Sequence, residues 1–134
     1  MLPDEYDLDA MINAYLECAI FASTDDDGRS LTSENFDVSD FDDAACEAAR
    51  EDCESFLADN LDKIPPDRVE DAGRDLWLSR NGHGAGFFDG GWNADGDDLQ
   101  RAARAYGSCD VIVVGEYDAE GSDTAYSSAT LTFA

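Results

Sequence analysis

Apolar residues recur at helical spacing near the start of the chain. Between residues 7 and 22 they return every three or four positions, which is the stripe of an amphipathic helix with one face in a core. The members of this stripe are Leu8, Met11, Ile12, Tyr15, Leu16, Ala19 and Ile20. Three consecutive aspartates followed by Gly28 indicate a turn over residues 23–30. The pattern therefore predicts a helix that leads into an acidic loop.

A second stripe predicts a longer helix over residues 40–62, capped by Ser39 or Asp40. Its inward positions are Phe41, Ala45, Ala49, Cys53, Phe56 and Leu57. Its outward positions carry carboxylates, at Asp43, Glu47, Glu51 and Glu54. The rise of an α-helix places these carboxylates about 6 Å apart along one side, which is comparable with the charge spacing of a nucleic-acid strand.

Proline and glycine divide the middle of the chain. The Pro65–Pro66 pair ends the second helix, and residues 66–72 are predicted to form a short helix that Gly73 stops. Alternation in residues 75–79 indicates a strand, and residues 85–88 follow as a second apolar segment after a glycine-rich turn. The two segments together predict a β-hairpin.

The last third of the chain predicts one more helix and two more strands. The helix is expected to start at Asp95 and to stop at Gly107. Its inward residues are Leu99, Ala102, Ala103 and Tyr106. Residues 111–114 are predicted to be a buried strand, and residues 124–133 alternate between two faces. One of these faces carries Ala129, Leu131 and Phe133.

The order of these elements predicts an α+β fold in a single small domain over residues 1–134. About three helices are expected to pack on a small antiparallel sheet that contains the glycine-rich hairpin. Residues 1–72 make up a helical, strongly acidic part, and residues 73–134 hold the hairpin, a helix and the last strands.

The charge of the chain bears on what such a domain can bind. The 134 residues include 32 acidic and 8 basic side chains, a formal net charge of −24. Residues 1–70 hold 21 of the acids and 4 of the bases, a net charge of −17. Because 43% of the residues are hydrophobic, the chain is not a disordered acidic tail. Its electrostatic field repels nucleic acid and anionic membranes and attracts a basic partner.

Metal, cofactor and membrane binding lack their sequence signatures. The cysteines are Cys18, Cys46, Cys53 and Cys109. They form no Cys-x-x-Cys pair and the chain has one histidine, so zinc is not expected. The aspartate-rich segments at residues 25–30 and 93–97 do not fit the register of a calcium loop. We expect free, buried thiols, no metal, no cofactor, no membrane span and a cytoplasmic location.

The run from Arg80 to Asp89 is the most distinctive in the chain. It contains Arg80, Asn81, Gly82, His83, Gly84, Gly86 and Phe87. It lacks the spacing and the lysine of a phosphate loop, and His83 has neither a nucleophile nor a substrate cleft in view. The favoured interpretation is a tight hairpin whose aromatic side chains pack on the helices and whose His83 bonds locally. The alternative is a small enzyme or ligand-binding domain built on this run.

Residues 75–89 read DLWLSRNGHGAGFFD and resemble the signature of a family of small, mostly uncharacterised proteins encoded by bacteriophages and related mobile elements. Residues 15–19, 23–26 and 99–113 are similar to other segments of the same family. The resemblance covers about residues 8–115, with Phe88 where the family has tryptophan. It implies a phage or mobile-element protein and transfers no reaction.

Three hypotheses for function remain open. The first is a phage or mobile-element interaction protein that mimics nucleic acid in the host cytoplasm. It would occupy the basic groove of a host defence or regulatory protein that binds DNA or RNA, and so inhibit it. Its binding residues are predicted to be Asp43, Glu47, Glu51, Glu54, Asp25, Asp26 and Asp27. The second is a domain adapted to molar salt, whose acidity serves the solvent. The third is the small enzyme or ligand-binding domain; no catalytic residue is assigned, and we expect no catalysis.

Overall fold

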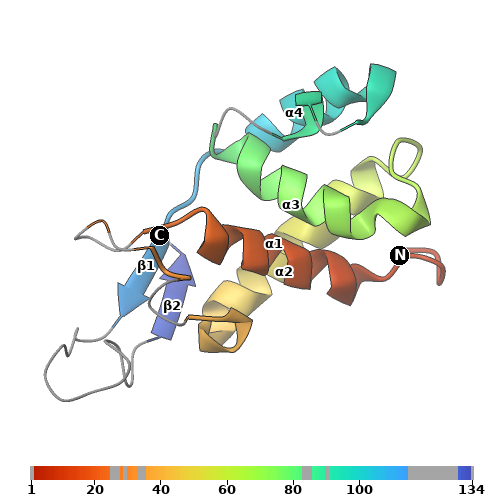
Figure 1. Cartoon of the computed structure of the whole chain (residues 1–134). Coiled ribbons are helices and arrows are strands. Elements are labelled where there is room, and N and C mark those ends of the chain that lie inside the picture. The colour runs from red at the N-terminus through yellow and green to blue at the C-terminus, as the bar shows by residue number, and fades with distance from the viewer. Residues whose placement is uncertain are drawn as a thin grey trace, which may run out of the picture.

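The computed structural model describes residues 2–24, 28, 30–32, 36–82, 86–89, 91–114 and 130–133. Its helices and strands within these ranges are α1 (Leu8–Phe21), α2 (Asp43–Asp59), α3 (Val69–Arg80), α4 (Gly96–Arg104), β1 (Val111–Val114) and β2 (Thr130–Phe133). Figure 1 shows the helices packed on one another, with the two strands at one end of the molecule. The expected mixture of helices and a small antiparallel sheet is confirmed.

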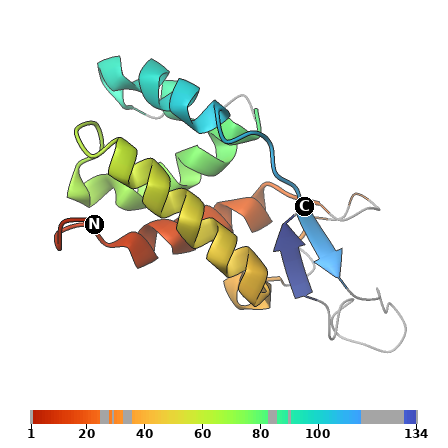
Figure 2. The same ribbon diagram turned by 180° about the vertical axis from the view of Figure 1, so that it is seen from behind.

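Packing between helices forms the body of the molecule. α3 lies along α1 and contacts α4 on another side, while α2 crosses α1. Figure 2, which views the molecule from behind, shows α2 running across α1 toward the strands. None of the described helices has the length and apolarity needed to cross a bilayer.

Aspartates cap the first two helices. The carboxylate of Asp7 accepts a hydrogen bond from the backbone N–H of Ala10 at 3.1 Å, where α1 begins. Asp42 accepts from the N–H of Ala45 at 2.8 Å and so caps α2. The predicted cap at Ser39 or Asp40 is wrong, because residues 38–40 form a separate 3-10 turn.

The predicted inward faces of the helices are largely confirmed. All six inward positions proposed for the second helix are buried, and so are six of the seven in α1, where Leu8 is half-buried. In α4, Leu99 and Ala103 are buried and Ala102 is half-buried, while Tyr106, which was expected in this helix, is half-buried in the turn that follows it. Apolar periodicity therefore located the core correctly along these three helices.

The predicted hairpin is wrong. Residues 75–79, expected to be its first strand, lie inside α3, and Phe87–Asp89 form a 3-10 turn in place of a second strand. α3 carries its own helical stripe, made of Val69, Ala72, Gly73, Leu76 and Trp77, all of which are buried. The alternation seen in the sequence was the end of this stripe. This helix raises the described α-helices to four, against about three expected.

Gly73 does not stop a helix; it allows two helices to touch. A Cβ placed on Gly73 would lie 2.3 Å from the backbone oxygen of Met11 in α1. Real Cβ atoms do not approach backbone oxygens so closely, so only glycine permits this separation of α1 and α3. The absent side chain serves tertiary packing, which overrides the low helix propensity of glycine.

The two strands pair in antiparallel register, with Val111 opposite Phe133 and Val114 opposite Thr130. The strand at residues 111–114 is confirmed, but its burial was overestimated. Ile112 and Val114 are 39% and 49% exposed, because a two-stranded sheet at the end of the molecule buries only one face.

β2 connects the sheet to the helices. Leu131 is buried, and its carbonyl accepts a hydrogen bond from the backbone N–H of Asp42 at 2.8 Å. The ring of Phe133 lies 5.5 Å from that of Trp77 and 6.3 Å from that of Tyr15. The predicted alternation is confirmed for residues 130–133, and residues 124–129 lie outside the described ranges.

Candidate functional site

The four carboxylates predicted on the outer side of the second helix lie on one exposed face of α2. We call this set, Asp43, Glu47, Glu51 and Glu54, the α2 acidic face. The helical repeat places all four within an arc of about 80° over a length of about 16 Å. None of them makes an ion pair or a hydrogen bond with another residue in the described part of the chain. The face therefore presents charge that the surrounding residues leave uncompensated.

Basic residues near the face are already paired. Arg50 of α2 bonds Asp9 of α1, with 2.7 Å between Nη2 and Oδ1. Across the described residues, six of the seven basic side chains contact a carboxylate, Arg104 being the exception. Each such pair uses the positive charge locally, so the net excess of acid remains on the surface.

A groove borders the C-terminal half of the α2 acidic face. It has a volume of about 730 Å³, and its lining combines carboxylates of Asp4, Glu51 and Glu54 with apolar groups. The apolar lining includes Leu2, Pro3, Tyr6, Leu8 and Ala58. This groove could not be predicted from the sequence, because the segment before α1 has no periodicity.

The segment before α1 is held in place by a tyrosine. The hydroxyl of Tyr6 donates to the backbone oxygen of Ile64 at 2.5 Å and also lies 3.3 Å from that of Leu61. These bonds span more than fifty residues of sequence, so local patterns could not have indicated them. The remaining predicted binding residues, Asp25, Asp26 and Asp27, lie outside the described residues.

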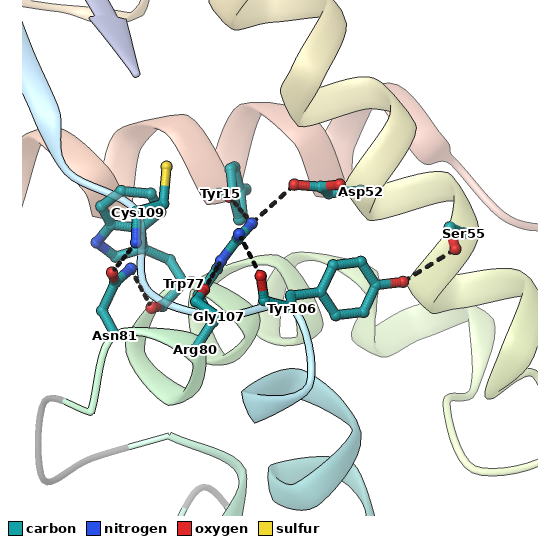
Figure 3. Close-up of polar contacts among 9 residues, drawn as sticks. All are labelled: Tyr15, Asp52, Ser55, Trp77, Arg80, Asn81, Tyr106, Gly107 and Cys109. Atoms are coloured by element: carbon teal, nitrogen blue, oxygen red, sulfur yellow. Dashed lines mark hydrogen bonds and ion pairs between the residues drawn. The ribbon is translucent and has the colours of Figure 1, made fainter. Parts of the chain in front are cut away.

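Arg80, the first residue of the glycine-rich run, is a buried hub. Its side chain is 8% exposed and its Nη1 donates to Oδ2 of Asp52 at 2.7 Å and to the hydroxyl of Tyr15 at 2.9 Å. Its Nε and Nη2 donate to the backbone oxygens of Gly107 and Tyr106, at 2.8 and 3.1 Å (Figure 3). One guanidinium thus joins α1, α2, α3 and the turn after α4.

Asn81 links the end of α3 to the chain that enters β1. Its Nδ2 donates to the backbone oxygen of Trp77 at 2.9 Å, and its Oδ1 accepts from the N–H of Cys109 at 2.7 Å (Figure 3). Gly82 follows with φ of +67°, a left-handed conformation that glycine adopts without strain. His83 and Gly84 lie outside the described residues.

The far end of the run folds back onto α3. Gly86 has φ of +139°, and a Cβ there would lie 2.2 Å from Oγ of Ser79. That buried hydroxyl accepts from the N–H of Phe87 at 3.1 Å and donates to Oε1 of Gln100 at 2.6 Å. The ring of Phe87 is fully buried and stacks on Phe56, with 5.4 Å between centroids. The expected packing of this aromatic residue on the helices is confirmed.

An acid upstream of the run has the same anchoring role. Asp75 accepts from Nε1 of Trp92 at 2.7 Å, and the guanidinium of Arg68 lies 3.8 Å from the centroid of the Trp92 ring. Burial raises the pKa of Asp75, and the hydrogen bond from Trp92 opposes that shift. Asp75, Ser79 and Asn81 therefore direct their polar side-chain groups at neighbouring parts of the same chain, as Arg80 does.

The described thiols are free and differ in burial. Cys18 and Cys53 are buried as expected, Cys109 is half-buried, and Cys46 is exposed, which contradicts the expectation for that residue. Cys46 lies in the first turn of α2, beyond the edge of the core. Burial raises the pKa of Cys18 to about 11, so its thiol stays protonated near neutral pH. No cluster of three or more possible metal ligands occurs among the residues that the structure describes.

Comparison of the chain with models of protein families, with curated proteins and with solved structures finds no significant match. The assignment of function consequently depends on the geometry of the α2 acidic face and its surroundings.

Proposed function

We propose that this protein binds a basic, nucleic-acid-binding host protein through the α2 acidic face, as a phage or mobile-element interaction protein that imitates a nucleic-acid strand. The observation that carries the proposal is the row of four exposed carboxylates on one helix, none paired within the described residues. A regular row of uncompensated charge resembles the side of a nucleic acid that a basic groove contacts.

Two physical effects favour this kind of partner. The net charge of −24 accelerates encounter with a positively charged groove through long-range attraction, and salt weakens that attraction. A helix also holds its carboxylates at fixed separations, which favours a binding surface of matching spacing. Nucleic acid itself is repelled by the same field and is not proposed as a ligand.

The proposal is tested by removing charge from the face without changing its shape. The test variant carries Asp43→Asn, Glu47→Gln, Glu51→Gln and Glu54→Gln. A matched control removes the same charge elsewhere, by Asp67→Asn, Glu70→Gln, Asp97→Asn and Asp110→Asn, all at exposed positions. We expect the test variant to associate with the captured host protein about tenfold or more slowly than the control, measured by surface plasmon resonance.

Competition decides whether binding is mimicry. A host protein captured on the wild type is expected to be released by duplex DNA or RNA at physiological salt, because both would occupy one basic groove. The proposal is contradicted if the host protein stays bound when duplex DNA or RNA is added. It is also contradicted if the test variant and the control variant weaken binding equally. Neutralising the face is expected to leave thermal stability unchanged or higher, since like charges four residues apart destabilise a helix.

Salt separates this proposal from adaptation to a saline solvent. We expect the protein to be folded and to melt cooperatively at about 0.1 M KCl, where the Debye length is about 10 Å. Circular dichroism across a series of KCl concentrations checks this expectation. If the chain becomes helical only as the salt concentration approaches 1 M, the acidic residues are an adaptation to high salt. The main support for a basic partner would then be lost.

A further inference from the structure

The indole of Trp77 carries a buried donor that the fold does not use. Trp77 is 2% exposed, and its Nε1 has no hydrogen-bond acceptor among the described residues. Buried polar groups are nearly always bonded, and leaving one unbonded costs about 1–3 kcal/mol. Trp92, the other tryptophan, bonds its Nε1–H to Asp75 at 2.7 Å. Of the two tryptophans, Trp77 is therefore the one whose buried N–H lacks an acceptor among the described residues.

Trp77 forms part of the wall of a cleft. The cleft has a volume of about 380 Å³ and separates the residues after α1 from the chain that leads into β1. Besides Trp77, its lining includes Ser23, Thr24, Asn81, Ser108 and Cys109. Figure 3 shows the indole of Trp77 beside Asn81 and Cys109. The size lies within the usual range for small-ligand sites.

The lining argues against an anionic ligand. Asp110 is part of the wall, and no basic side chain is among the described lining residues, so an anion would be repelled. Hydroxyl groups and an amide favour a molecule with hydrogen-bonding edges. The unused indole N–H requires an acceptor, which a neutral ligand supplies best through a carbonyl oxygen.

We propose that this cleft binds a small uncharged molecule whose amide-type carbonyl accepts a hydrogen bond from Nε1 of Trp77. The nitrogen is covered, so a lining side chain must move to admit the oxygen. Cys109 is the side chain that we assign to this movement, because it is half-buried and adjoins the indole (Figure 3). The site is separate from the α2 acidic face and does not depend on its function.

The two indole N–H signals of the ¹⁵N-labelled protein provide the test, with Trp92 as the internal reference. N-methylacetamide and uracil are the neutral probes, and acetate is the charged one. We expect the Trp77 indole proton to move downfield along a saturable curve with a neutral probe, while the Trp92 signal stays in place. Acetate is expected to give no saturable shift. Trp77→Phe assigns the two signals.

Two substitutions at Cys109 make the test specific to the cleft. Cys109→Ala is expected to retain binding, and Cys109→Met to weaken it about tenfold or more, equivalent to ~1.4 kcal/mol, by filling the entrance. Binding that is unchanged in Cys109→Met overturns the proposal. So does a shift that grows linearly and equally for both indoles, or a Trp77 signal that no neutral probe moves, which would leave water as its only acceptor.

Discussion

Replacing Arg80 by alanine is expected to lower the free energy of unfolding by about 3 kcal/mol, the lower end of the cost of removing one partner of a buried ion pair, because the side chain of Asp52 is 33% exposed. The substitution leaves the carboxylate of Asp52 without its cation and the backbone oxygens of Tyr106 and Gly107 without a donor. It also removes the donor to the hydroxyl of Tyr15. Urea unfolding followed by circular dichroism measures the change.

An exposed arginine gives the matched control. Arg101 pairs with Asp98 at 3.3 Å, and the two side chains are 77% and 57% exposed. Arg101→Ala is expected to cost no more than about 1 kcal/mol, because water screens such a pair. Arg80→Lys keeps the charge but loses the fork of donors, so it is expected to remain clearly destabilised. If Arg80→Ala and Arg101→Ala had equal free energies of unfolding, the contacts of Arg80 would not stabilise the fold as we expect.

Gly73→Ala is expected to destabilise the protein by several kcal/mol, although alanine is the better helix former by about 1 kcal/mol. The new methyl group would lie 2.3 Å from the backbone oxygen of Met11, which belongs to α1 and cannot rotate away. α1 and α3 would have to separate, and overpacking of this kind typically costs about 1–3 kcal/mol or more. Thermal unfolding and urea titration measure the loss.

Gly82→Ala controls for the chemistry of the substitution. Gly82 has φ of +67°, but a Cβ there meets nothing within 4 Å. Its replacement therefore adds only the left-handed backbone strain, which is about 1–2 kcal/mol. If Gly73→Ala proved as stable as the wild type, the contact between α1 and α3 would have to be looser than described.

α1, α2 and α4 could be predicted because each buries a stripe that is visible in the sequence. The inward residues of α1 and α2 follow from periodicity alone, and so does the acidic face on the other side of α2. The caps were harder, since several aspartates compete around residues 37–43 and only one position satisfies the first free N–H groups.

α3 was misread because glycine has two possible roles in such a segment. It can end a helix, or it can lie within a helix where another helix packs closely against it. Gly73 reads as a helix stop when only neighbours in sequence are considered, and that reading broke the stripe from Val69 to Trp77 into two pieces. The true reason for glycine lies in α1, about sixty residues earlier, where Met11 needs the space. A single sequence carries no record of such a contact.

The parts of the candidate site also differ in how far the sequence predicts them. The α2 acidic face is a local pattern and was found from the sequence. The neighbouring groove depends on Tyr6 bonding the oxygen of Ile64, and the hub depends on Arg80 meeting Tyr15 and Asp52. These contacts join distant segments through side chains of ordinary type, so only the folded chain reveals them.

The position of Asp52 has a consequence for recognition. Asp52 lies about 180° around α2 from Asp43 and about 100° from Glu51, so Arg80 holds this helix on a side that the acidic face does not occupy. Fraying of α2 would expose the guanidinium and its partners together, which ties the order of the helix to that of α1 and α3. A partner would therefore meet carboxylates whose backbone is already fixed, and binding would forfeit little conformational entropy.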